Sequence, residues 1–171
     1  PNPSQMLLDG RPSGESGTCV ACVMEGTRPV LAEVQALVAK TSFNVPRRTA
    51  DGFDFNRAAL LLAVAEKRGG MKLSLFDAYI NVIGGLRLDE PSADMSSALA
   101  LISTLRDQPV REDLIAFGEI GLSGEIRGVS HAEARVSEAA RLGFTRCVLP
   151  LSNLKSMAEP QKYPIELIGV R

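Results

Sequence analysis

One serine of the chain, Ser92, has a place in a tight turn that would suit a catalytic nucleophile. Ser92 follows Pro91 and precedes Ala93, a setting that can present a hydroxyl at the start of a helix. A serine attacks a carbonyl group only when a neighbouring base removes its proton. A serine/lysine hydrolase carries a lysine for this purpose on a later helix, but the helix expected after Ser130 offers Glu133 instead. A carboxylate with a pKa of about 4 is a poor base, so we predict that hydrolysis has been lost.

The charged residues near this serine support the same prediction. Asp89, Glu90 and Asp94 crowd one loop, and their negative charge opposes the formation of an alkoxide or an oxyanion. Arg135 is the nearest cation to Glu133 along the chain, but a guanidinium stays protonated and cannot act as a base.

Other roles for these residues stay open at this point. Ser92 could be an N-cap, and Ser130 with Glu133 has the spacing of a capping box. An active peptidase would have to recruit an unexpected base, either His131, which is the only histidine, or Lys155.

The composition limits the class of protein. The chain has 171 residues, 45% of them hydrophobic, which suits a single domain over residues 1–171 with a polar lead-in at 1–17. A net charge of -1 gives no general attraction to nucleic acid or membranes, and no apolar run is long enough to span a bilayer. The absence of an initiator methionine suggests a fragment of a longer protein. An odd number of cysteines without an export signal favours a reducing cytoplasm.

Two cysteines have the spacing of half a zinc site. Cys19 and Cys22 lie in an expected strand, however, where positions three apart face opposite sides of the sheet. We therefore predict no metal site and no cofactor in this chain.

Hydrophobic periodicity and turn residues predict strands that alternate with helices. Apolar runs at 18–24 and 29–38 are typical of an antiparallel hairpin. Further strands are expected at 77–84, 114–119, 146–149 and 164–170. Helices are expected at 55–68 after Asp54, at 95–106 after Ser92 or Asp94 as N-cap, at 130–142 and at 151–157. This order predicts an α/β or α+β domain of two layers.

Several segments resemble a known family. The serine turn, the glycine-rich hairpin and the pattern from Gly143 to Pro150 are similar to the proteolytic domain of Lon proteases. Residues 25–37, 46–48 and 138–144 resemble more closely the C-terminal domain of the RadA (Sms) family of bacterial DNA repair proteins. This resemblance runs over nearly the whole chain. Matching to the Lon pattern puts Ser92 at the nucleophile and Glu133 at the catalytic lysine.

The resemblance implies a Lon-like fold of the ribosomal protein S5 domain 2 type. In that family the domain follows a zinc finger and a RecA-like ATPase core, and it forms part of a hexameric ring. This chain contains no G-x-x-x-x-G-K-[ST] loop, so no ATP chemistry is expected in it. We expect a proteolytically inactive domain of a DNA repair and recombination ATPase. The alternative is that the domain only supports oligomerisation and has a purely structural role.

The charges are unevenly distributed. Residues 40–72 carry seven basic and three acidic side chains, whereas residues 107–138 carry three basic and seven acidic ones. The basic region could bind DNA phosphates, or the two regions could meet between neighbouring subunits of a ring. The residues selected as DNA contacts are Arg47, Arg48, Lys67, Arg68 and Lys72. Because the chain has no tryptophan and its phenylalanines lie mostly among apolar residues, we expect no stacking platform and sequence-independent DNA binding.

Overall fold

The first two strands form the long hairpin that the apolar runs predict. β1 (Thr18–Glu25) and β2 (Arg28–Lys40) pair antiparallel along the whole of β1. The turn between them needs a positive φ at Gly26, where glycine has no steric cost. The computed structural model describes residues 8–83 and 86–171, so residues 1–7 of the lead-in and the strand end expected at Gly84 lie outside the described residues.

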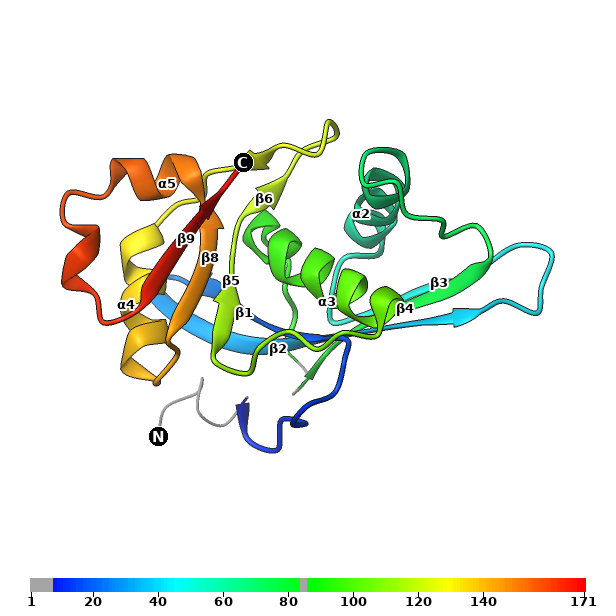
Figure 1. Cartoon of the computed structure of the whole chain (residues 1–171), viewed down its shortest axis with the longest axis horizontal. Helices are drawn as coiled ribbons and strands as arrows, with labels where there is room; N and C mark the ends of the chain where they lie inside the picture. The colour runs from blue at the N-terminus through cyan, green and yellow to red at the C-terminus, as the bar shows by residue number, and fades with distance from the viewer. Residues whose placement is uncertain (1–7, 84–85) are drawn as a thin grey trace.

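Within the described residues, seven strands form one mixed sheet (Figure 1). Their order is β3-β4-β2-β1-β5-β8-β9. β2 is antiparallel to β1 and β4, and the remaining neighbours in the sheet are parallel. The other strands of this sheet are β3 (Arg48–Asp51), β4 (Phe76–Val82), β5 (Leu114–Ala116), β8 (Arg146–Pro150) and β9 (Glu166–Val170). A separate short hairpin consists of β6 (Glu119–Ile120) and β7 (Ile126–Arg127).

Helices lie against both faces of this sheet. The helices and 3₁₀ turns that the structure describes in full are α2 (Phe55–Lys67), η2 (Pro91–Ala93), α3 (Asp94–Arg106), α4 (Ala132–Arg141), α5 (Leu151–Ser156) and η3 (Pro160–Lys162). The apolar residues of α2 and α3 pack on one face, and those of α4 pack on the other. The predicted α/β class is confirmed. The domain has three layers where two were expected, because helices cover both faces of the sheet and enclose β1.

β1 is the central strand and is buried on both sides. Cys19 and Ala21 belong to the core under α2 and α3, whereas Val20 and Cys22 belong to the core under α4. Cys19 and Cys22 therefore face opposite sides of the sheet, as predicted.

β3 is an element that the sequence analysis missed. No strand was expected between residues 38 and 77, but Arg48 begins β3 and pairs with Ala78 of β4. β3 has no apolar run of its own, and its strand conformation depends on hydrogen bonds to a partner far away in sequence. The strand expected at 114–119 is also shorter, because it ends at Ala116.

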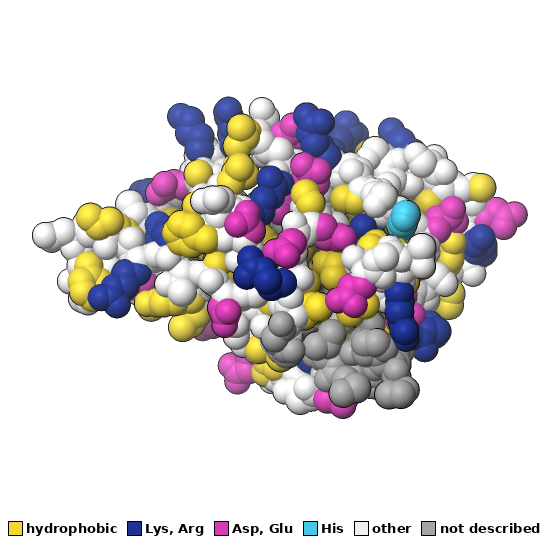
Figure 2. All heavy atoms as spheres, turned by 180° about the vertical axis from the view of Figure 1, so that it is seen from behind, with side chains coloured by type: hydrophobic (Ala, Val, Ile, Leu, Met, Phe, Trp, Pro, Cys, Tyr) yellow, Lys and Arg dark blue, Asp and Glu magenta, His cyan; other side chains and the backbone are white. Residues whose placement is uncertain are grey.

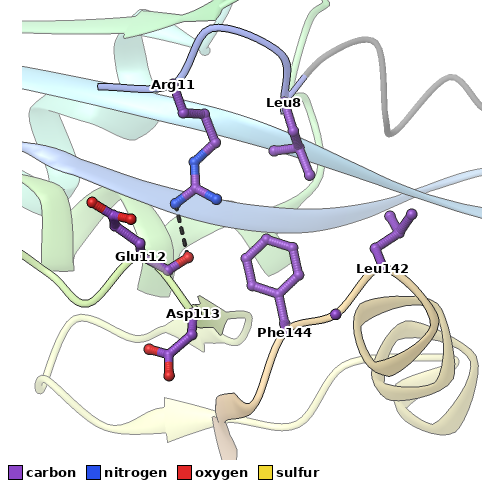
Figure 3. Close-up of a pocket in the computed structure, with 7 residues that line it drawn as sticks. Leu8, Arg11, Glu112, Asp113, Leu142 and Phe144 are labelled. Atoms are coloured by element: carbon purple, nitrogen blue, oxygen red, sulfur yellow. Dashed lines mark hydrogen bonds between the residues drawn. The ribbon is translucent and has the colours of Figure 1, made fainter. Parts of the chain in front are cut away.

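The end of the polar lead-in is fastened to the domain. Gly17 N donates to Ser103 Oγ at 2.8 Å. Arg11 Nη2 donates to the carbonyl oxygen of Glu112 at 3.0 Å, and its guanidinium lies 5.5 Å from the centre of the Phe144 ring (Figure 3). This segment thus contacts the start of β5 and the turn before β8. Within the described residues, none of the helices has the length and hydrophobicity needed to cross a bilayer.

Candidate functional site

Ser92 lies in the 3₁₀ turn that leads into α3, and it is only 2% exposed. Its hydroxyl donates a hydrogen bond to Glu90 Oε1 and accepts one from Arg135 Nη1 at 2.9 Å. The carbonyl oxygen of Ser92 accepts from Gly118 N at 2.9 Å, which holds the turn against the end of β5. The prediction that Ser92 caps α3 is wrong, because the N-cap position belongs to Ala93 and no side chain caps the helix there.

Arg135 holds the place beside this serine where a base would have to lie. Its side chain is 2% exposed, although arginine is rarely buried without partners. Nη1 is 2.7 Å from the carbonyl oxygen of Cys22 and 2.6 Å from Glu90 Oε1, and Nε donates to the carbonyl oxygen of Ser130 at 2.9 Å. A guanidinium with these acceptors stays protonated, so it can orient the Ser92 oxygen but cannot remove a proton.

Glu90 accepts the hydrogen bond that the Ser92 hydroxyl donates. Burial alone would raise the pKa of Glu90, but the hydrogen bonds from Ser92 and Arg135 outweigh burial and hold the pKa below its ordinary value. Its second oxygen accepts from Met24 N at 3.2 Å. A carboxylate with a lowered pKa is a weaker base than an ordinary one, so the Ser92 hydroxyl keeps its proton.

A cavity of about 230 Å³ adjoins these side chains. Glu90 and Glu119 both line it, together with Ser92 and Arg135. Two carboxylates in the lining oppose a developing oxyanion, and Glu90 is the one acid of the serine loop among the lining residues.

Asp94 has a structural role that differs from the predicted helix cap. Its fully buried carboxylate accepts from Arg57 Nε at 2.9 Å and from Ile120 N at 3.0 Å. Burial raises the pKa of Asp94, and the hydrogen bonds from Arg57 and Ile120 oppose this rise. The ion pair joins α2, α3 and the β6–β7 hairpin, and it takes Arg57 out of the set of free basic side chains.

The other residues selected from the sequence are Ser130, His131, Glu133 and Lys155, and Ser130 lines the same cavity as Ser92. Glu133 is exposed and accepts from the Tyr163 hydroxyl at 2.7 Å. The predicted capping box is wrong, because the N-cap of α4 is His131, with a left-handed φ of 58° and no capping side chain. Lys155 is exposed on α5. In the part of the chain that the structure describes, no hydrogen bond joins Ser92 to any of them.

One signal could have identified Arg135. It shares the buried face of α4 with Val136 and Ala139, so a charged residue stands where the helical period calls for an apolar one. A buried arginine requires polar partners, and the polar residues of the Ser92 turn were candidates for that role.

The five predicted DNA contacts lie in different environments. Arg47, Lys67, Arg68 and Lys72 are exposed. Arg48 is half-buried, and its guanidinium donates to the carbonyl oxygens of neighbouring residues, including that of Leu73 at 3.0 Å. Arg48 therefore holds β3 and β4 together. Of the exposed four, Arg68 Nε donates to the carbonyl oxygen of Leu122 at 3.5 Å, and the Arg47 guanidinium contacts the Phe43 ring.

Comparison with known families agrees with this geometry. Residues 65–167 match the profile of the Lon protease (S16) C-terminal proteolytic domain. The chain belongs to this family. In this Lon-type domain an arginine donates a hydrogen bond to the buried serine, and the serine hydroxyl donates one to a glutamate.

The Lon-type domain is also similar to longer proteins, each named DNA repair protein RadA. It is 52% identical to the protein of Halalkalibacterium halodurans, 48% to that of Bacillus subtilis and 47% to that of Streptococcus pneumoniae. Each similarity covers 99% of this chain and lies in the C-terminal region of the relative. The chain spans 36% to 40% of the length of these relatives. The resemblance predicted from the sequence is thereby confirmed.

Proposed function

We propose that this chain is a proteolytically inactive Lon-type domain of a RadA-type DNA repair and recombination ATPase. The observation that carries the proposal is the hydrogen bond between the Arg135 guanidinium and Ser92 Oγ. A permanently protonated group occupies the position of the base, and the serine beside it is only 2% exposed. The ATPase core and zinc finger belong to the longer protein, which we place in the cytoplasm.

We further propose that the domain binds DNA without regard to sequence. Four of the selected basic side chains are exposed: Arg47, Lys67, Arg68 and Lys72. Phosphate contacts of this kind fix a protein on DNA but carry no sequence information. Because a chain with a net charge of -1 binds DNA weakly, the domain would act in a ring-shaped homo-oligomer, a hexamer in the longer protein.

A second candidate function has one observation in its favour. The hydroxyl of Ser92 donates to a carboxylate, as a serine activated by Glu90 would. Such a peptidase would react with a fluorophosphonate, and the reaction would disappear in Ser92→Ala. We expect no labelling of the native chain. A third candidate, a purely structural oligomerisation module, would form the ring without binding DNA.

A salt series separates the first candidate from the third, and labelling by the fluorophosphonate separates both from the second. DNA affinity and particle size are measured together over a salt series, for this chain and for a longer protein that contains it. For an Arg47→Ala, Lys67→Ala double variant we expect weaker binding and a salt slope smaller by about 0.9 for each lost contact with duplex DNA. Lys155→Ala is the control, since it removes one exposed charge from α5. Equal affinity of both variants and the parent at low salt would disprove the DNA contact.

A further inference from the structure

The loop between β2 and β3 carries exposed apolar side chains at one end of the molecule. It projects beyond the sheet, at the end away from β9 and α5 (Figure 1). Phe43 is 48% exposed, Val45 is 76% exposed, and Leu75 of the adjoining segment is also exposed. Seen from behind, this end of the molecule shows hydrophobic side chains beside basic ones (Figure 2).

An arginine is stacked on the aromatic ring of this loop. The Arg47 guanidinium lies 4.0 Å from the centre of the Phe43 ring. Within residues 8–83 and 86–171, none of the ion pairs involves Arg47. The cation thus orients the ring and keeps its charge available for a ligand.

The loop is held in this shape before any ligand binds. Thr41 N donates to the carbonyl oxygen of Leu75 at 2.8 Å, and Phe43 N donates to Thr41 Oγ1 at 3.1 Å. At the other end of the loop, Arg47 N donates to the buried Asp77 carboxylate at 2.7 Å. A loop fixed at both ends loses little conformational entropy on binding.

The charge around the loop indicates the kind of ligand. Residues 40–50 contain three basic side chains and no acidic one, and residues 71–76 contain one lysine and no acid. Asp77, the nearest acid after this segment, is buried under the loop. A half-exposed ring next to a cation that is in no described ion pair suits a flat, apolar group attached to a phosphate, which is a nucleotide with an unpaired base.

We propose that Phe43, backed by Arg47, stacks on an unpaired base of single-stranded DNA while Arg47 and Lys40 contact its phosphates. This inference rests on the proposed DNA-binding function and narrows it to a strand with exposed bases. It departs from the expectation that the chain has no stacking platform, because Phe43 lies between Ser42 and Asn44 in a loop that leaves its side chain 48% exposed.

The test compares three variants on single-stranded DNA, on duplex DNA and on an abasic strand of equal charge. Phe43→Ala should weaken single-stranded binding by about 5- to 100-fold and leave abasic binding unchanged, because stacking contributes that much per base. Phe55→Ala is the matched control, since Phe55 is 52% exposed at the start of α2, and it should bind like the parent. Phe43→Trp should retain affinity. Because the chain has no other tryptophan, its emission should be quenched by single-stranded DNA and not by the abasic strand.

Three results would overturn the inference, and they differ in what else they affect. Equal single-stranded affinity for Phe43→Ala and the parent would disprove base stacking and leave the DNA-binding function standing. An absence of DNA binding by the parent, alone and in the longer protein, would disprove both. Phe43→Ala could instead form a smaller oligomer while each subunit keeps its affinity for single-stranded DNA. This result would assign the loop to a contact with a second copy of the chain.

Discussion

The hydroxyl of Ser92 donates a hydrogen bond to the Glu90 carboxylate and accepts one from the Arg135 guanidinium. Both partners are charged, and both are held in place by further hydrogen bonds, from Met24 N to Glu90 and from Arg135 to the carbonyl oxygen of Cys22. This network gives the serine a structural role that does not depend on nucleophilic attack. It links η2, β1 and α4, so its residues contribute to the stability of the fold.

Removal of the buried cation should therefore destabilise the domain. For Arg135→Met we expect a loss of about 3 kcal/mol in the free energy of unfolding, because Glu90 and the carbonyl oxygens of Cys22 and Ser130 lose their donor. The figure lies at the low end for buried pairs, since Glu90 is partly exposed. Chemical denaturation measures the loss. Arg141→Met on the same helix is the control and should change stability by less than about 1 kcal/mol, because the Arg141 pair with Glu138 is exposed on the arginine side. Similar midpoints for the two variants would contradict the structural role.

A carboxylate at the start of β5 makes stability depend on pH. Hydrogen bonds from Arg111, and then from Thr145, lower the pKa of Asp113 from 3.8 to about 2. A lowered pKa means that this stabilisation is complete above the pKa of the unfolded chain, and is lost as the pH falls toward that of the folded chain. Asp113→Asn should therefore be less stable than the parent above about pH 4, and the two denaturation midpoints should converge near about pH 2. A constant difference across this range would show that the charge of Asp113 is not responsible.

At the level of elements, strong periodicity gave reliable predictions and weak periodicity did not. The hairpin of β1 and β2 and the helix α2 follow from long apolar patterns, and both are present. β3 consists of Arg48 to Asp51, which carry no apolar pattern, and it forms because β4 offers free backbone groups. The serine of the candidate site was found from its turn, but its partner Arg135 was not, because the packing of α4 against β1 and β2 decides which side chain reaches the turn. Long-range pairing of this kind is not encoded in any local pattern.

The start of α4 gives a direct test of the rejected capping box. Ser130→Ala should change the free energy of unfolding by less than about 0.5 kcal/mol, since the Ser130 side chain does not cap the helix and only its carbonyl oxygen is used. His131→Gly should instead stabilise the domain by about 1 kcal/mol, because glycine adopts the left-handed conformation without strain. Denaturant midpoints of the two variants measure both effects. A loss of about 1 kcal/mol in Ser130→Ala would restore the capping box.

The whole molecule is organised around a sheet that separates two hydrophobic cores. Cys19 faces one core, and Cys22 and Cys147 face the other. Burial raises the pKa of Cys19 and Cys22 to about 12 and also raises that of Cys147. A thiol in this state is protonated at neutral pH and cannot attack a disulfide reagent.

The thiols therefore report on the integrity of both cores. We expect no reaction of the native chain with an aromatic disulfide reagent at about pH 8, and release of three equivalents after unfolding in guanidinium, since the chain has three cysteines. The time course of absorbance measures the reaction. Rapid labelling of one cysteine in native buffer would mean that the corresponding core opens without global unfolding.

The position of β1 also determines how the domain responds to mechanical load. β1 is hydrogen-bonded on both sides, to β2 and to β5, and the segment before it is attached to Ser103 through Gly17. β9 is an edge strand that pairs with β8 alone. A pulling force that enters through Thr18 must shear two sets of hydrogen bonds at once, whereas a force that enters through Val170 can peel one edge strand away. When force is applied to both ends of the domain, β9 should detach from the sheet first, and β1 should stay paired with β2 and β5 at that stage.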